Sequence, residues 1–303
     1  MRADTWWRVT LAVGLGCAGS LAVAAFAPLL IRAQPEPETA HLDLVCLFLP
    51  TNSDWAAHLM SYAILLLLLV GLICGFSSFL RLMARTRYTL RRLLEFTRPV
   101  DGALQTLLEP IQLADRLDLV QTEVPLAFCY GLLRPRICLS TGMVSALEED
   151  ELIALLWHER SHLLHRDPFR VAFGRAWTAM FFFLPVVRAL YKRYLLAKEV
   201  DADAYACAQQ GGNGPLAAAL WVLMEQKASV GSSPRTATAG ASDELETRVA
   251  WLLGEPRALT IPLVPTLASS IVLLGLTGLE LALTHAGVAN ALWSLSHKAL
   301  GGC

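Results

Sequence analysis

Three long runs of apolar residues dominate the pattern along the chain, and they cover about residues 7–31, 56–80 and 263–284. A helix of roughly 20 apolar residues crosses a hydrocarbon core of about 30 Å, and each run is long enough for this. We therefore predict about three transmembrane helices. The first run has an alternative interpretation as a cleaved signal peptide, with Arg2 and Arg8 as its basic region and residues 22–24 as its cleavage signal.

The loops beside the first two spans differ in charge, and this difference predicts their orientation. Residues 32–55 carry one arginine and four carboxylates, whereas residues 81–98 carry six arginines and one glutamate. Because basic loops stay on the cytoplasmic side, we expect the N-terminus and residues 81–262 inside and residues 32–55 outside. The chain is then a multi-pass protein of the cell membrane, with the lipid membrane as one partner.

The stretch between the second and third runs is more polar and has the size of a domain. Its apolar spacing predicts a helix over residues 101–119, followed by a β-hairpin whose two short strands lie at 126–130 and 136–140. The next helix is expected to be capped by Ser145, with Glu148 completing a capping box. Another helix is predicted over residues 191–210.

The composition narrows the function classes. Apolar residues make up 55% of the chain and charged residues 17%, whereas an ordinary soluble domain has about 25% charged residues. This content excludes global disorder. The formal net charge of −1 argues against a nucleic-acid partner, because such proteins carry a basic excess. The seven cysteines contain no C-x-x-C pair and do not form a disulfide scaffold.

The helix that follows the hairpin carries a candidate metal site, His158-Glu159-Arg160-Ser161-His162. Histidines at positions i and i+4 lie on one face of a helix, so both can bind the same ion. Neutral imidazole suits Zn²⁺, and Glu159 can act as general base on a metal-bound water. A chance match is expected on the order of once per hundred such chains, so the motif favours a metal site without proving one.

A third ligand is predicted on the helix over residues 191–210, where Glu199 and Asp203 share a face. Glu199 would complete three protein ligands for one Zn²⁺ per chain and leave the fourth position to water. Asp203 would bind the far nitrogen of a ligating histidine and fix its tautomer. Alone, this pair is more simply a solvated acidic patch, but its position downstream of the two histidines favours the metal site.

A further apolar run, residues 176–187, limits how these ligands can meet. A single crossing of the membrane would separate Glu199 from His158, and two crossings need roughly 40 residues plus a turn. Only 36 residues lie between His162 and Glu199. Because the run is short and contains Pro185, we expect it to lie at the bilayer surface or in the domain core.

Several of these stretches together resemble the M56 family of membrane zinc metallopeptidases of the BlaR1/MecR1 type. The M48 family of Ste24 and HtpX proteases is the next most similar. The stretches that carry the resemblance are residues 134–142, 147–152, 158–162 with 166–168, 183–187 and 199–203. The resemblance implies a gluzincin-like fold, helices around a small β-hairpin or sheet, in which His158, His162 and Glu199 hold zinc and Glu159 is catalytic.

The chain also departs from the antibiotic-sensing members of that family. No serine is followed by a lysine three positions later, so the nucleophile of a penicillin-binding domain is absent and β-lactam sensing is not expected. An oxyanion donor is expected, with Tyr205, Arg193 and His165 as candidates. A fourth ligand at His165 is disfavoured, because it would close the open position that hydrolysis needs.

Residues 229–243 are rich in Gly, Ser, Thr and Ala and are expected to form a flexible linker. The resemblance makes this linker a candidate for self-cleavage, because M56 sensors cut themselves. An uncut surface loop is the simpler alternative. A short amphipathic piece over residues 244–253 is expected between the linker and the third span.

We therefore predict a mainly α membrane protein with about three transmembrane helices and a gluzincin-like α+β zinc peptidase domain. The expected divisions are residues 1–98 with the first two spans, 99–228 as the peptidase domain, 229–262 as linker and short helix, and 263–303 as the last span and tail. The predicted function is a zinc-dependent endopeptidase that cuts a protein or peptide at the cytoplasmic membrane face. The alternative is a membrane signal-transducing protein whose zinc domain is mainly structural. A homodimer is left open.

Overall fold

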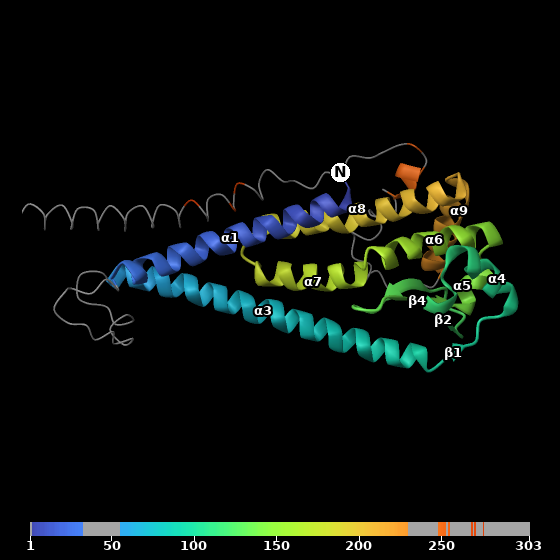
Figure 1. Cartoon of the computed structure of the whole chain (residues 1–303), viewed down its shortest axis with the longest axis horizontal. Coiled ribbons are helices and arrows are strands. Elements are labelled where there is room, and N and C mark those ends of the chain that lie inside the picture. The colour runs from blue at the N-terminus through green and yellow to red at the C-terminus, as the bar shows by residue number, and fades with distance from the viewer. Residues whose placement is uncertain are drawn as a thin grey trace, which may run out of the picture. The chain divides into compact units, whose positions relative to one another are not determined.

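Long apolar helices and a small sheet make up the computed structural model (Figure 1), which describes residues 2–32, 55–229 and 248–252 and positions 254, 268, 270 and 275. The chain divides into two units. The first unit contains Met1–Trp7, Ser77–Ala176 and Tyr191–Ile261, and the second contains Arg8–Phe76, Trp177–Leu190 and Pro262–Cys303. Each unit is described by itself below.

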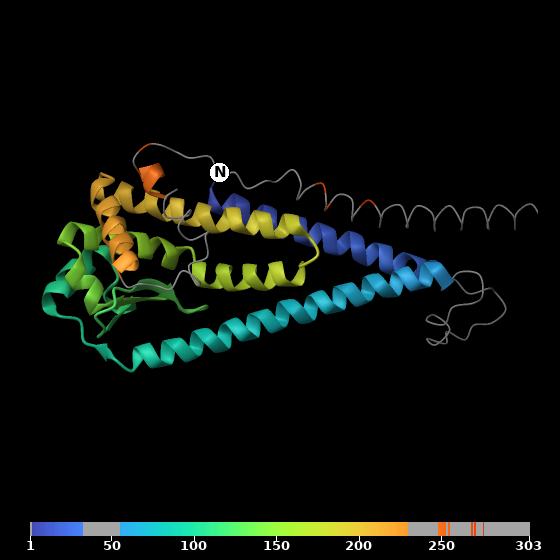
Figure 2. The same ribbon diagram turned by 180° about the vertical axis from the view of Figure 1, so that it is seen from behind.

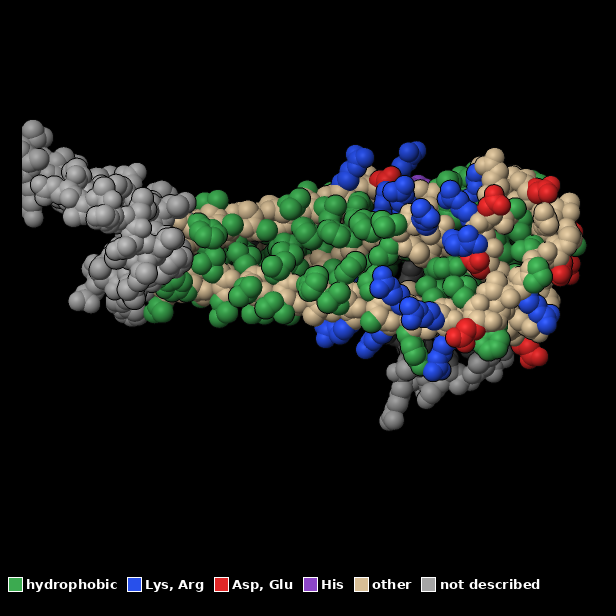
Figure 3. All heavy atoms as spheres, turned by 60° about the horizontal axis from the view of Figure 1, so that its bottom comes forward, with side chains coloured by type: hydrophobic (Ala, Val, Ile, Leu, Met, Phe, Trp, Pro, Cys, Tyr) green, Lys and Arg blue, Asp and Glu red, His purple; other side chains and the backbone are tan. Residues whose placement is uncertain are grey.

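Two helices account for most of the described second unit. Helices α1 (Ala3–Arg32) and α3 (Trp55–Leu94) contain segments that are long and apolar enough to cross a membrane, Ala3–Phe26 and Ser61–Leu94. Large apolar side chains such as Leu66 and Phe76 are exposed on them, and Figure 3 shows a nearly continuous apolar surface there. Such a surface suits lipid rather than water. The predicted third span, residues 263–284, lies almost entirely outside the described residues.

The apolar run over residues 176–187 is the turn between two helices. Helix α7 (Asp167–Met180) ends inside the run, and α8 (Pro185–Gln210) begins with the proline, whose missing N–H costs nothing at a helix start. Phe181 and Leu184 in the turn are buried. In the second unit the turn lies against both apolar helices, with Trp177 on Gly14 of α1 and the Met180 carbonyl on Gly71 of α3. The run is therefore only partly buried, with Phe182 and Pro185 exposed, and it packs against α1 and α3 rather than in the core around the sheet.

The first unit contains a four-stranded mixed sheet in the order β1-β2-β4-β3. Strands β3 (Ala127–Tyr130) and β4 (Arg136–Ser140) form the predicted hairpin, with Phe128 opposite Cys138. Strand β2 (Leu117–Val120) pairs in parallel with β4, and the two-residue β1 (Thr97–Arg98) pairs antiparallel with β2. Strand β3 is thus an edge strand of the sheet.

The predicted helix over residues 101–119 is wrong in its second half. Helix α4 (Gly102–Ile111) ends at Gln112, which adopts the left-handed conformation with φ 57°. A short 3-10 turn, η1 (Ala114–Arg116), then leads into β2. The leucines that continue the helical spacing, such as Leu117 and Leu119, are buried in the sheet instead. Apolar spacing alone does not distinguish a buried strand from a helix.

The helix caps that follow the hairpin in the chain differ from the predicted cap at Ser145. Ser140 caps the short helix α5 (Thr141–Ala146) by accepting from the Met143 backbone N–H. The capping box belongs to the next helix, α6 (Glu149–Leu164), and joins Glu148 to Glu151, not Ser145 to Glu148. The acidic residues at the start of α6 also suit the positive end of the helix dipole. Helix α9 (Gly214–Ser229) packs on α6 (Figure 2).

Candidate metal centre

Helix α6 brings its two histidines and the intervening glutamate into the interior of the first unit. His158, Glu159 and His162 are each less than 8% exposed. The Nε2 atoms of the two imidazoles lie 3.1 Å apart, and their rings are nearly perpendicular. The predicted i, i+4 pair therefore points two imidazole nitrogens at one place.

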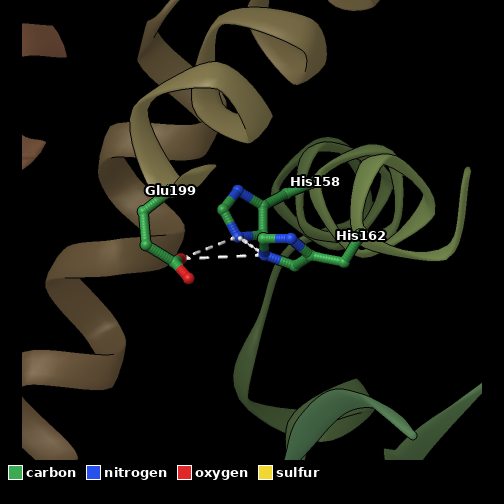
Figure 4. A group of neighbouring side chains, drawn as sticks. All are labelled: His158, His162 and Glu199. Carbon is green, nitrogen blue, oxygen red and sulfur yellow. Dashed lines mark hydrogen bonds and ion pairs between the residues drawn. The ribbon is translucent and has the colours of Figure 1, made fainter. Parts of the chain in front are cut away.

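Glu199 reaches the same place from α8 (Figure 4). Its Oε2 atom lies 3.5 Å from His158 Nε2 and 3.7 Å from His162 Nε2. One ligand atom from each of the three residues lies within 4.8 Å of the others. The structure thus brings together the three residues that the sequence predicted as metal ligands.

Each histidine also contacts a carboxylate through its other ring nitrogen. Asp203 Oδ1 lies 2.8 Å from His158 Nδ1, as predicted, and Asp167 Oδ2 lies 2.6 Å from His162 Nδ1. A carboxylate in this position accepts the Nδ1 hydrogen and leaves Nε2 free to bind a metal. Tyr194 in turn donates its hydroxyl to Asp167 over 3.3 Å.

Asp167 was not predicted from the sequence. It begins α7 only five positions after His162, but the chain turns between them at Arg166, which has φ 53°. Helical spacing therefore does not indicate that the two side chains meet. The signal that existed was its place in the stretch 166–168, which carries part of the family resemblance.

Two cations that the sequence analysis missed also lie in this cluster. The Lys198 ammonium contacts Glu199 Oε1, and Arg248 Nη1 lies 3.3 Å from Glu199 Oε2. Arg248 also donates to both oxygens of Asp203, through Nε at 2.8 Å and Nη2 at 2.6 Å. Arg248 is 45 positions from Asp203, and no motif or spacing connects them.

These neighbours control the charges of the cluster. Burial would raise the pKa of Glu199, but hydrogen bonds from His158 and His162 and the charge of Lys198 hold that pKa well below its usual value. Burial likewise opposes a low pKa at Asp203, and hydrogen bonds from Arg248 and His158 outweigh it. For His162, burial lowers the pKa, yet the hydrogen bonds to Asp167 and Glu199 raise it to about 9. The cluster therefore keeps ionised carboxylates around its imidazoles.

A cavity of about 460 Å³ opens beside the cluster. It is lined by all three candidate ligands, by Glu159, Lys198 and Arg248, by the edge strand around Leu126–Cys129 and by leucines of α9. The buried Glu159 Oε2 atom has no hydrogen-bond partner among the described residues. A buried polar atom without a hydrogen-bond partner costs free energy. Such an atom therefore indicates a position where a ligand or water binds. Two imidazoles, a carboxylate and this atom together fit a divalent metal ion with a bound water.

The three candidate oxyanion donors do not line this cavity. Tyr205 accepts a hydrogen bond from Arg160, Arg193 lies over the Trp6 ring, and His165 Nδ1 contacts the Ser161 carbonyl. Among the described residues, the cations that do line it are Lys198 and Arg248. The proposed oxyanion roles of Tyr205, Arg193 and His165 therefore receive no support from the geometry.

A comparison with protein families decides the relationship. The family model described as BlaR1 peptidase M56 matches residues 49–252, about two thirds of the chain. The chain belongs to the M56 peptidase family. This confirms the resemblance drawn from the sequence motifs, and the matched range includes the His-His-Glu cluster. Two long apolar helices in an M56 member also support a membrane protein.

A curated relative gives weaker support for the same chemistry. The protease HtpX homologue of Thermoplasma acidophilum is 37% identical to this M56 member over 68 residues. The match covers 22% of this chain and 22% of that protein, so it concerns a fragment of each. The similarity to M48 peptidases expected from the sequence is therefore present, but local.

Proposed function

We propose that this M56 family member is a zinc-dependent endopeptidase with a gluzincin-like domain. The observation that carries the proposal is the meeting of His158, His162 and Glu199 in a cavity that the buried Glu159 also lines. A purely structural zinc site has four protein ligands and no use for a buried general base. Here the described residues supply three ligands and so leave one position open, and Glu159 offers an oxygen that has no partner among those residues.

The residues of the chain divide the work between binding and proton transfer. His158, His162 and Glu199 would hold one Zn²⁺, which when bound supplies a Lewis acid and lowers the pKa of a water molecule. Glu159 takes a proton from the attacking water and passes it to the leaving amine. Asp203 and Asp167 hold the two imidazoles in the tautomer that presents Nε2 to the ion.

The edge strand β3 gives a place for a protein or peptide substrate. Its residues Ala127, Phe128 and Cys129 line the cavity, and its outer edge is unpaired in the described sheet. An extended peptide that adds to this edge would gain backbone hydrogen bonds and lie along the cavity. Binding of an extended chain, rather than a chain end, supports endopeptidase activity.

The proposed location is the cytoplasmic face of the cell membrane, with the peptidase domain at residues 99–228 and a third span at 263–284. The charge difference between residues 32–55 and 81–98 supports this orientation. Lipid is then a constant partner, and a regulatory role in signalling is part of the proposal. No nucleic-acid partner is proposed.

The test is to measure zinc content and peptide cleavage for the wild type and Glu159→Gln, purified in detergent. The substitution removes the general base and keeps the three ligands, so we expect about one zinc per chain in both proteins and cleavage only in the wild type. The loss in rate should be at least about 100-fold, the usual contribution of general-base catalysis. If both proteins bind zinc and neither cleaves peptide, the result would favour a signalling protein with a structural zinc domain. If the wild type binds no zinc, the proposed metal centre would be refuted.

A further inference from the structure

The residues just beyond the undescribed stretch 230–247 form a short helical segment, Arg248–Leu252, in the first unit. Leu252 is 3% exposed and packs with Ala154 of α6 and Leu216 and Leu220 of α9. Asn213 donates to the Leu252 carbonyl over 2.9 Å. The segment is thus held against the same two helices that border the cavity, and its first residue lies at the cluster.

Arg248 contacts two carboxylates that stand one helical turn apart on α8. Its guanidinium donates to both oxygens of Asp203 and lies 3.3 Å from Glu199 Oε2, the oxygen that faces the two imidazoles. Asp203 also contacts His158. The Arg248 guanidinium is therefore in contact with one candidate metal ligand, Glu199. It is also in contact with Asp203, the carboxylate beside a second candidate ligand, His158.

The shape of the guanidinium makes this arrangement specific. Arginine presents several donors in a fixed plane and can hold two carboxylates at once, whereas lysine offers a single point charge. Asp203 is fully buried, and a buried carboxylate that loses its partner pays a large desolvation cost. Without Arg248, Asp203 would lose the two hydrogen bonds that hold its carboxylate in place, and its contact with His158 would be disturbed.

We propose that Arg248 is a positioning residue of the metal centre, so that the segment Arg248–Leu252 completes a site whose ligands lie on α6 and α8. This inference rests on the proposed function, because it assumes that the cluster binds zinc. It adds that zinc affinity depends on a residue of the chain beyond position 247, outside the helices that carry the ligands.

The test compares four full-length proteins in detergent: wild type, Arg248→Ala, Arg248→Lys and Arg136→Ala. Arg136 is the matched control, because it makes a similar two-bond contact with Asp118 in the sheet, through Nε at 2.6 Å and Nη2 at 2.7 Å, and does not line the cavity. The zinc dissociation constant is measured by competition with a chelator, the ligand geometry by the visible spectrum of the Co²⁺ form, and stability by thermal unfolding of the zinc-free proteins.

We expect Arg248→Ala to bind zinc about 10- to 100-fold more weakly, as is usual for loss of a group that orients metal ligands, and to change the Co²⁺ spectrum. Arg248→Lys should restore only part of the affinity, since lysine cannot hold both carboxylates. Arg136→Ala should lower the unfolding temperature yet keep the wild-type zinc affinity and spectrum.

Three results would overturn the inference. Zinc affinities of both Arg248 variants within twofold of the wild type would show that Arg248 does not position the ligands. An equal loss in Arg136→Ala would show that the effect is general destabilisation. If Arg248→Ala does not fold, Arg248→Lys decides by the same measurements. A wild type that binds no zinc would refute the proposed metal centre and the inference with it. This outcome is distinct from a zinc affinity that is the same with and without Arg248, which would refute the inference alone.

Discussion

At the scale of single residues, the sequence predicts the contacts made along a helix and misses those made between distant segments. His158 and His162, or Glu199 and Asp203, share a face because four positions make about one helical turn. Asp167 and Arg248 meet the cluster only because α7 turns away from α6 and the segment at 248 docks back. Neither contact corresponds to a regular spacing in the sequence, so neither could be predicted from it.

Asp167→Ala is expected to weaken zinc binding by about 10- to 100-fold, because His162 loses the carboxylate that fixes its tautomer. Tyr194→Phe is the milder comparison, since it removes only the hydroxyl that donates to Asp167. The measurement is the zinc dissociation constant of each purified protein. Equal affinity for Asp167→Ala and the wild type would show that the contact does not orient His162.

Asp118, which lies outside the metal cluster, is expected to make a pH-dependent contribution to the free energy of unfolding. Burial would raise its pKa, but hydrogen bonds from Arg136 and Tyr130 outweigh burial and lower the pKa below the usual value. The carboxylate therefore stabilises the fold at pH values above about 4, and this contribution is lost as the pH falls through the lower folded pKa. Because the pair is partly exposed, we expect about 1 kcal/mol.

The measurement is the thermal unfolding of the wild type and Asp118→Asn from pH 7 to pH 3. The wild type should unfold at the higher temperature at pH 7, and the difference should shrink below pH 4. A difference that stays constant with pH would mean that the charge of Asp118 contributes nothing.

At the scale of elements, the hairpin of β3 and β4 was predicted correctly because turn residues separate two short apolar runs. Strand β2 was mistaken for the end of a helix, because its buried leucines continue a helical spacing. The turn between α7 and α8 was also not predicted. Several of its apolar residues pack against α1 and α3, and composition alone does not predict what a short apolar run packs against.

Gly71 gives a test of that packing. A methyl group at Gly71 would lie 2.4 Å from the Met180 carbonyl oxygen, so Gly71→Ala forces the turn away from α3. We expect a loss of about 1–3 kcal/mol, typical of overpacking. Gly16→Ala is the control, since nothing lies within 4 Å of the added methyl and alanine favours a helix. Thermal unfolding in the same detergent compares them, and equal stability of the two variants would contradict the packing.

At the scale of the whole molecule, two of the three predicted spans correspond to helices of the structure that could cross a membrane. Long uninterrupted apolar runs can be recognised as membrane spans from the sequence, because few helices of soluble proteins contain such runs. Orientation is different, because it depends on charges that interact with the membrane during insertion and is not a property of the folded chain. It stays a prediction from the loop charges.

Cysteine labelling can test the orientation in a variant whose native cysteines are replaced by serine. Ser53→Cys lies in the acidic loop and should react with a membrane-impermeant reagent in intact cells. Thr89→Cys lies on the exposed, arginine-rich part of α3 and should react only after permeabilisation, because basic loops face the cytoplasm. The opposite pattern would reverse the proposed topology.

The docked segment Arg248–Leu252 has a consequence for a chain cut between positions 229 and 248. Its contacts with Asp203, Asn213 and the leucines of α9 do not depend on an unbroken backbone. The two pieces would stay together as a complex, but the peptide link that sets a high local concentration of the segment would be gone. Cutting would therefore make the contact between Arg248 and the cluster dissociable, so that the zinc affinity would fall when the segment leaves and rise again when a copy of the segment is added.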